Sequence, residues 1–409
     1  MKKYWKLIVI VPLIVIVIGA FYIKSALSAG SYPEIMLEKK QGNESAIQDI
    51  ALKGLYHTES FSSELTLTAD GADFDADNSF FERVSRFNLY NKQVASLQDR
   101  YRGFMRGKSG SASSYVETDN VVGYAEVINQ SFDSGNNSME FAVAVLNKKN
   151  NETMEFAVMV PNRAKYRSVR IQDVQYVNGE LKVITKNSLE LSKTNDVNEE
   201  IHVYSFNMDK KELTGEEMIM KIGHESYTRP LSTSYHYNTS PNQIVVFKKM
   251  KEETVQQQDM KKGASAEVTK TRVEGITAYN LKTDEKLDVK LPEKLREQQI
   301  LAVEDSSLYL QSAAKGKLEV VQYDMMRRKV TNRFGLDAGG TDSQYLNARA
   351  TEVHDGKLSI LFTKGNSPVA QQLTVINIES GKTVYAGEIT LEKPSDGKEI
   401  LNFYKMSVR

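Results

Sequence analysis

LTVINIESGKTVYAGEITL, residues Leu373–Leu391, is the stretch from which the fold can be predicted. Apolar and β-branched residues dominate Leu373–Ile378 and again Thr383–Leu391, and the four residues between them are Glu379-Ser380-Gly381-Lys382. β-Branched residues favour strands, and glycine readily adopts the positive φ that a tight hairpin connection often needs. The stretch therefore predicts two strands joined by a turn.

Similar strand–turn–strand units recur upstream. Asn178-Gly179 and Asp355-Gly356 are dipeptides typical of two-residue hairpin turns, and each lies between two apolar runs. Met-Glu-Phe-Ala-Val occurs twice, at residues 139–143 and 154–158, on either side of a polar segment, which predicts a further hairpin. Four units align on one central apolar residue each, with successive separations of 75, 42 and 54 residues: Tyr204, Tyr279, Val321 and Val375.

The largest of these separations contains a polar insert, Lys248–Arg272 (KKMKEETVQQQDMKKGASAEVTKTR). Because the insert has few apolar residues, we expect an exposed loop that is partly helical or disordered. A long excursion between strands either carries a binding element or is a dispensable solvated loop.

Repeats of roughly 40–50 residues are typical of the four-stranded blades of β-propellers. In pattern, the units resemble the blades of PQQ-like and related bacterial β-propellers, over residues 60–409 and most clearly from residue 174. The sequence has no WD dipeptide, Kelch double glycine or Asp-box motif, and its only tryptophan is Trp5, so no single family is indicated. The resemblance implies an all-β propeller of six or seven blades. A β-sandwich or a mixed two-domain β protein is the alternative.

An apolar segment without charged residues, Leu7–Ile23, follows a short basic tail that contains Lys2, Lys3 and Lys6. As a helix, this segment would be about 26 Å long, close to the thickness of a bilayer core. Because the lysines precede the segment, the positive-inside rule predicts a cytoplasmic N-terminus. We therefore expect a single-pass signal-anchor helix in the lipid bilayer of the cell membrane, with the bulk of the chain extracytoplasmic.

This reading divides the chain into a cytoplasmic tail at 1–6, the anchor at 7–23, a tether at 24–58 and an extracytoplasmic domain at 59–409. Within the tether, Ser45–His57 has apolar residues near helical spacing and predicts either a short helix or a first strand. The alternative to an uncleaved anchor is a signal peptide removed near the small residues of Ala26–Ala29.

Composition excludes several classes of function. Lys+Arg and Asp+Glu are both 53, so the formal net charge is zero, and the basic excess expected of a nucleic-acid-binding protein is missing. The 409-residue sequence has no cysteine, which excludes disulfides, thiolate metal sites and cysteine nucleophiles. With 40% hydrophobic and 26% charged residues, the chain has a globular composition.

Alternating carboxylates in Asp70–Asn78 (DGADFDADN) form the one candidate metal site: Asp73, Asp75 and Asp77. Ca²⁺ binds six to eight oxygen ligands, which closely spaced aspartates can supply. Counted from Asp73, the EF-hand positions for Gly and Glu hold Asn78 and Val84, so an EF-hand is excluded. An acidic hairpin loop explains the same residues without a cation.

Aromatic residues gather around an arginine in Tyr227–Tyr237 (YTRPLSTSYHY), and this segment provides the candidate ligand-binding residues: Arg229, Tyr235, His236 and Tyr237. Such a set could line a carbohydrate- or peptide-binding surface, although tyrosines also occur widely at the edges of β-sheets. The sequence contains no metal-binding H-E-x-x-H motif, nucleophile elbow, P-loop or dinucleotide fingerprint.

Taken together, these features favour a non-catalytic binding or scaffolding module whose partner is an envelope protein or a cell-wall ligand. The alternative is an envelope enzyme, such as a propeller-type hydrolase or lyase acting on glycans. That alternative requires histidines and carboxylates to converge in one pocket, which only a structure can test.

Overall fold

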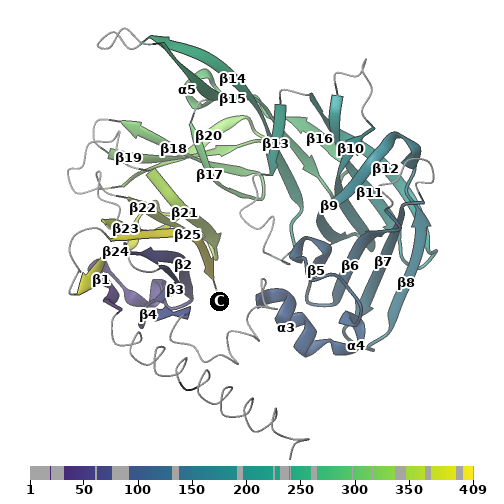
Figure 1. The fold of residues 1–409 in the computed structure, drawn as a ribbon, viewed down its shortest axis with the longest axis horizontal. Helices are drawn as coiled ribbons and strands as arrows, with labels where there is room; N and C mark the ends of the chain where they lie inside the picture. The colour runs from purple at the N-terminus through teal and green to yellow at the C-terminus, as the bar shows by residue number, and fades with distance from the viewer. Residues whose placement is uncertain are drawn as a thin grey trace, which may run out of the picture. The chain divides into compact units, whose positions relative to one another are not determined.

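The computed structural model describes residues 19, 32–59, 62–75, 92–130, 138–190, 197–223, 226–230, 239, 241–258, 265–296, 298–314, 317–336, 347–363, 370–392 and 399–408. These residues form an all-β fold with six antiparallel sheets, five of four strands and one of five (Figure 1). The chain divides into two compact units, one of residues 1–88, 311–320 and 332–409, the other of residues 89–310 and 321–331.

Three sheets of the second unit are meanders in which each strand pairs with the next along the chain. The first consists of β5 (Tyr115–Glu117), β6 (Val121–Ile128), β7 (Glu140–Asn147) and β8 (Thr153–Met159). The next consists of β9 (Tyr166–Val177), β10 (Glu180–Leu189), β11 (Val197–Asn207) and β12 (Glu212–Gly223). The third consists of β13 (Ser226–Pro230), β14 (Ile244–Gln258), β15 (Ser265–Asn280) and β16 (Glu285–Asp288). The α-helices among the described residues of this unit are α3 (Lys92–Arg100), α4 (Arg102–Met105) and α5 (Glu293–Arg296).

A further meander contains β17 (Gln299–Glu304), β18 (Ser307–Ala314), β19 (Lys317–Asp324) and β20 (Lys329–Leu336). In each of the two sheets of the first unit, a strand from the beginning of the described chain pairs with a strand from its end. One pairs the last strand, β25 (Ile400–Val408), with β2 (Ile50–His57), which continues to β3 (Ser62–Thr68) and β4 (Gly71–Phe74). The other runs from β21 (Asn347–His354) through β22 (Lys357–Thr363) and β23 (Gln371–Asn377) to β24 (Thr383–Glu392), whose outer edge is covered by β1 (Glu34–Gly42).

Successive sheets of the second unit pack face to face, and β11 illustrates why both of its faces are apolar. Tyr204 and Phe206 point to the β5–β8 sheet, where Phe141 lies 4.7 and 5.4 Å from their ring centres. The residues that alternate with them, Ile201 and Val203, join the core shared with β14. Because successive side chains of a strand point to opposite faces, a strand between two sheets buries residues on both faces, and from Ile201 to Phe206 only His202 and Ser205 are polar. A stack of meanders of this kind is consistent with a propeller-like or a mixed β fold.

The hairpins predicted from turn residues are confirmed. Asn178 and Gly179 both have positive φ, 53° and 83°, as a type I′ turn requires, and they connect β9 to β10. Asp355-Gly356 connects β21 to β22 in the same way, and the two Met-Glu-Phe-Ala-Val segments form β7 and β8. The stretch Leu373–Leu391 forms β23 and β24 with Gly381 at φ 68°.

The alignment of the repeats is also confirmed, because all four aligned residues are buried and each lies on the third strand of its sheet: Tyr204, Tyr279, Val321 and Val375. Their burial fits an interior position, since a strand with neighbours on both sides is more apolar than an edge strand. Six sheets occur within the described residues, and the number of propeller blades stays a prediction.

One expectation is wrong. The described part of the insert Lys248–Arg272 is not a loop but extends β14 and β15, which pair from Ile244↔Asn280 to Gln258↔Ser265 with one register shift at Lys249/Met250. Polar residues can form strands when each strand supplies the other's backbone hydrogen bonds, so low apolar content did not exclude a hairpin. The segment expected as a tether contains β1 and β2. Of the two alternatives predicted for Ser45–His57, the strand is the one that forms, preceded by a short 3₁₀ turn at Glu44–Ala46.

The predicted anchor at Leu7–Ile23 lies outside the described residues except for Gly19. Within the described part of the chain, no helix is both long enough and apolar enough to cross a bilayer.

Candidate functional site

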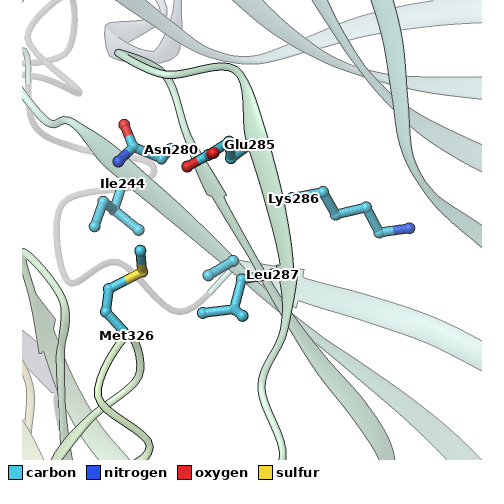
Figure 2. A pocket seen from close by; sticks show the side chains of 7 residues that line it. Ile244, Asn280, Glu285, Lys286, Leu287 and Met326 are labelled. Carbon is cyan, nitrogen blue, oxygen red and sulfur yellow. The ribbon is translucent and has the colours of Figure 1, made fainter.

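One candidate site is a small cavity at one end of the β13–β16 sheet (Figure 2). Its volume is about 240 Å³, and its lining combines apolar side chains with three polar ones: Ile244, Ala278, Leu287, Met326, Asn280, Glu285 and Lys286. Cavities that hold small-molecule ligands usually measure roughly 300–1,000 Å³. This cavity therefore has room for one side chain or a small fragment of a ligand.

The polar groups at this cavity already have roles in the turn between β15 and β16. The Asn280 side-chain oxygen accepts hydrogen bonds from the backbone N–H groups of Lys282 and Thr283, at 2.9 and 3.3 Å. The Glu285 carboxylate accepts one from the Thr283 hydroxyl at 3.0 Å. Figure 2 shows the Lys286 side chain directed away from Ile244 and Met326. The cavity thus offers an apolar floor and little polar chemistry for a reaction.

A denser set of ionisable groups surrounds His202 on β11. Its Nε2 lies 3.0 Å from the Glu200 carboxylate, and its Nδ1 lies 3.2 Å from that of Glu216, although the angle at Nδ1 is not that of a hydrogen bond. The ring stacks on Tyr204 at 5.7 Å between ring centres, and the Tyr166 hydroxyl lies 3.5 Å from Nε2. The two carboxylates approach different nitrogens of the ring, so they do not converge with the histidine on one point.

Burial determines what the His202 cluster can do. Only 4% of His202 is exposed, and burial raises the pKa of both Tyr166 and Tyr204, which keeps their hydroxyls protonated. Asn187 donates a hydrogen bond to the Tyr204 hydroxyl at 3.0 Å and accepts one from Thr185 at 2.7 Å. The polar groups of the cluster thus contact one another, and the histidine itself is buried, although the side chains of Glu200 and Glu216 are 15% and 25% exposed. The cluster is best explained as a polar network that holds β9 to β12 together.

A buried lysine connects the β9–β12 sheet to the next one. The Lys182 ammonium is held by the Asp284 carboxylate at 3.0 Å, by Glu180 at 3.1 Å and by the Ser205 hydroxyl at 2.9 Å. Asp284 also accepts a hydrogen bond from the Tyr279 hydroxyl at 3.1 Å. Lys182 is 3% exposed, so these partners replace the water that its charge has lost. This network fixes the β15–β16 turn against β10 and β11.

Two carboxyl groups are unusually hard to ionise. Burial raises the pKa of Asp173 on β9 to about 7, although hydrogen bonds from Gln175 and from the Val174 backbone oppose the shift. Burial likewise raises the pKa of Glu352 on β21 to about 7, opposed by the charge of Lys405. Groups with such shifts often mark active sites, but here neither lines the cavity of Figure 2.

The predicted site residues are only partly described. Asp73 lies on β4, exposed and paired with Thr66, and Asp75 follows the strand, whereas Asp77 lies outside the described residues. No group of three or more histidines and carboxylates suited to a metal ion is found among the residues with a described placement. Arg229 lies on β13 opposite Lys248, and Tyr235, His236 and Tyr237 fall outside the described residues. Neither predicted set is therefore tested as a whole, and both stay predictions.

The His202 cluster was missed from the sequence because its members come from four strands, β9 to β12. One signal was available: Glu200, His202 and Tyr204 alternate along one strand, which places all three on the same face. Tyr166 and Glu216 join them only through the pairing of the strands.

No protein-family model and no curated protein sequence matches the chain. Among solved structures, similarity is found to a prolyl endopeptidase at 9% identity and TM-score 0.33, covering 86% of this chain and 50% of that one. An uncharacterised protein of Listeria monocytogenes EGD-e has 10% identity and TM-score 0.31, covering 65% and 64%. The polysaccharide lyase Uly1 has 10% identity and TM-score 0.32, covering 68% and 57%. The chain thus spans about half to two thirds of the length of these proteins.

Proposed function

We propose that this chain is a binding or scaffolding module of the β-propeller type, anchored in the membrane by Leu7–Ile23 and exposed outside the cytoplasm. The single observation that carries the binding function is the two-stranded ribbon formed by the ends of β14 and β15. Its partner would be another protein of the cell envelope.

The ribbon is the part of β14 and β15 that lies beyond their pairing with β13 and β16. β14 pairs with β13 only over Phe247–Lys251, and β15 pairs with β16 only over Thr277–Asn280. Between Glu252↔Thr271 and Gln258↔Ser265, the described strands pair only with each other. Figure 1 shows β14 and β15 continuing together past their shorter neighbours. Seven residue pairs give the ribbon a length of about 23 Å.

A ribbon of this kind suits protein binding better than catalysis. Both of its backbone edges can accept a further strand, which is a common mode of peptide recognition. An isolated two-stranded hairpin is at best marginally stable in water, so the ribbon gains stability when a partner covers it. Among the described residues, the open cavity is small and its polar groups serve the neighbouring turn, which also favours binding.

The test is to remove the ribbon without disturbing the sheet. Residues 252–271 would be replaced by Asn-Gly, because Lys251 and Arg272 are paired and an Asn-Gly turn closes such a hairpin. A photo-crosslinking residue at 255 or 268 of the full chain, expressed in bacterial cells, should capture one envelope protein. The same residue at the exposed Ala164 should not capture it.

The captured protein, when purified with its own tag, should bind the full chain and fail to bind the shortened chain. Equal binding of both forms would refute the role of the ribbon. Sequencing the mature N-terminus tests the anchor: a chain that begins at Met1 in the membrane fraction supports it, and one that begins near Gly30 refutes it.

The alternative, an envelope hydrolase or lyase acting on glycans, is favoured only by the grouping of Glu200, His202 and Glu216. If the purified chain cleaved cell-wall glycans and His202→Asn abolished the cleavage while the circular dichroism spectrum stayed unchanged, the scaffold proposal would be wrong.

A further inference from the structure

β8 is an edge strand whose outer side is open among the described residues. β8 ends the order β5-β6-β7-β8, so within the described residues only β7 pairs with it. Its pairing with β7 runs over Thr153–Met159 without a bulge, and its sequence, TMEFAVM, has one charged residue, Glu155, and no proline. A long, flat, weakly charged edge is a template for another strand.

The last strands of the other five meanders are protected in recognisable ways. β24 is covered by β1, and β4 and β16 are only four residues long. β12 shifts register three times against β11 and carries several glutamates. β20 carries Lys329 and Arg333. Bulges, charges, short strands and covering segments are the usual means of preventing edge-to-edge pairing, and β8 has none of them apart from Glu155.

The sequence of β8 indicates what would pair with it. Met-Glu-Phe-Ala-Val occurs in β7 at 139–143 and in β8 at 154–158, and the two copies already pair antiparallel inside the sheet. Ala142 lies opposite Ala157, and Phe141 and Val143 lie opposite Val158 and Phe156. On its inner edge, β8 is therefore paired with a copy of its own sequence. On its outer edge, the β8 strand of a second molecule would present the same five residues.

We propose that β8 of one chain pairs antiparallel with β8 of a second copy, in the register that repeats its pairing with β7. Ala157 then lies opposite Ala157 of the second copy on the two-fold axis, and Phe156 lies opposite Val158. Glu155 lies opposite Met159, so no like charges meet across the interface. The two β5–β8 sheets become one eight-stranded sheet. Because each chain uses its single β8 edge, the assembly closes as a dimer.

This inference is independent of the proposed membrane and ribbon functions, and Ala157 offers a sharp test. Its side chain is exposed on an edge strand, so a charged residue there leaves the fold intact. In the purified chain, Ala157→Glu and Ala157→Lys each place like charges opposite one another on the axis. Analytical ultracentrifugation should show a concentration-dependent dimer for the unchanged chain and a loss of dimer affinity of at least about tenfold for each variant.

The decisive measurement mixes the two variants. Glutamate opposite lysine restores an attractive pair, so an equimolar mixture of A157E and A157K should form a heterodimer although neither forms a homodimer. Ala164→Glu, an exposed substitution away from β8, should leave the dimer unchanged. The proposal would be overturned if the unchanged chain stayed monomeric at every concentration measured. It would also be overturned if the two variants dimerised as well as the unchanged chain.

Discussion

Replacing Asp173 by asparagine should stabilise the protein at neutral and alkaline pH. Asp173 lies on β9 with 7% of its surface exposed, and its carboxylate accepts hydrogen bonds from Gln175 at 3.1 and 3.2 Å and from the Val174 N–H at 2.9 Å. These neutral donors do not compensate for lost water, so burial raises the pKa of Asp173 from 3.8 to about 7.

The sign of the effect follows from proton linkage. Between pH 4 and 7, the folded state holds a proton on Asp173 that the unfolded state has lost, so the free energy of unfolding falls as pH rises. The fall is at most about 1.4 kcal/mol per pH unit and about 4 kcal/mol in all, as an order of magnitude. Asparagine resembles the protonated acid and does not ionise, so Asp173→Asn should remove this part of the pH dependence.

The assay is urea unfolding of the full chain, followed by circular dichroism at pH 4.5, 6, 7.5 and 9. The variant should match the unchanged chain within about 1 kcal/mol at pH 4.5 and exceed it by about 2–4 kcal/mol at pH 7.5 and above. Asp99→Asn is the matched control, because the Asp99 side chain is 80% exposed and should show no such trend. A difference between variant and unchanged chain that stays constant with pH would refute the reasoning.

Three further predictions concern turns and an ion pair. Gly42→Ala should release β1 from β24, because Gly42 has φ +88° and an added Cβ would lie 2.1 Å from the Val384 carbonyl oxygen. The rate of amide hydrogen exchange in β1 should therefore rise by at least tenfold. Gly179→Ala should lower the free energy of unfolding by only about 1–2 kcal/mol, since φ is +83° but no atom lies within 4 Å of the added Cβ. Thermal unfolding measures this loss, and a loss as large as that of Gly42→Ala would contradict the prediction. Burial raises the pKa of Glu117, but hydrogen bonds from Arg100 and other donors outweigh burial and hold that pKa below its usual value. The ionised carboxylate therefore stabilises the fold above about pH 4.5, and this stabilisation is lost on acidification. Arg100→Ala should therefore move the acid unfolding midpoint to higher pH, at a cost of about 1 kcal/mol at pH 7, and an unchanged midpoint would count against the pair.

Local signals in the sequence predicted much of the fold. Asn178-Gly179 specifies its own hairpin because the positive φ angles it needs are a property of those two residues. The alignment on Tyr204 and its counterparts worked because a third strand is buried on both faces wherever it lies in the chain. Features that depend on a distant partner were missed. β1 is a strand because it pairs with the edge of β24, about 350 residues later in the chain. The sequence of β1 alone does not indicate this pairing.

The candidate sites were harder to predict for the same reason. The Tyr227–Tyr237 segment attracted attention through its composition, but composition does not say whether side chains converge. The His202 network has a local signal in the alternation of Glu200, His202 and Tyr204, but that alternation does not show that the histidine itself is buried. Residue type and spacing identify candidates, and the packing of the sheets decides which of them solvent and ligands can reach.

The repeated architecture itself directs attention to strand edges. A meander of four strands always leaves an outer strand with unpaired backbone groups, and each sheet must protect that edge or use it. This chain covers the edge of β24 with its own β1, which demonstrates that a fifth antiparallel strand fits on the outside of such a sheet. The edges of β8 and of the β14–β15 ribbon have no covering strand among the described residues. The ribbon is polar and extends from its sheet, which suits a partner of different sequence, whereas β8 carries the sequence of the strand it already pairs with. The two edges should therefore bind different partners. Shortening the ribbon should leave the β8 dimer intact, and Ala157→Glu should leave ribbon-dependent crosslinking intact.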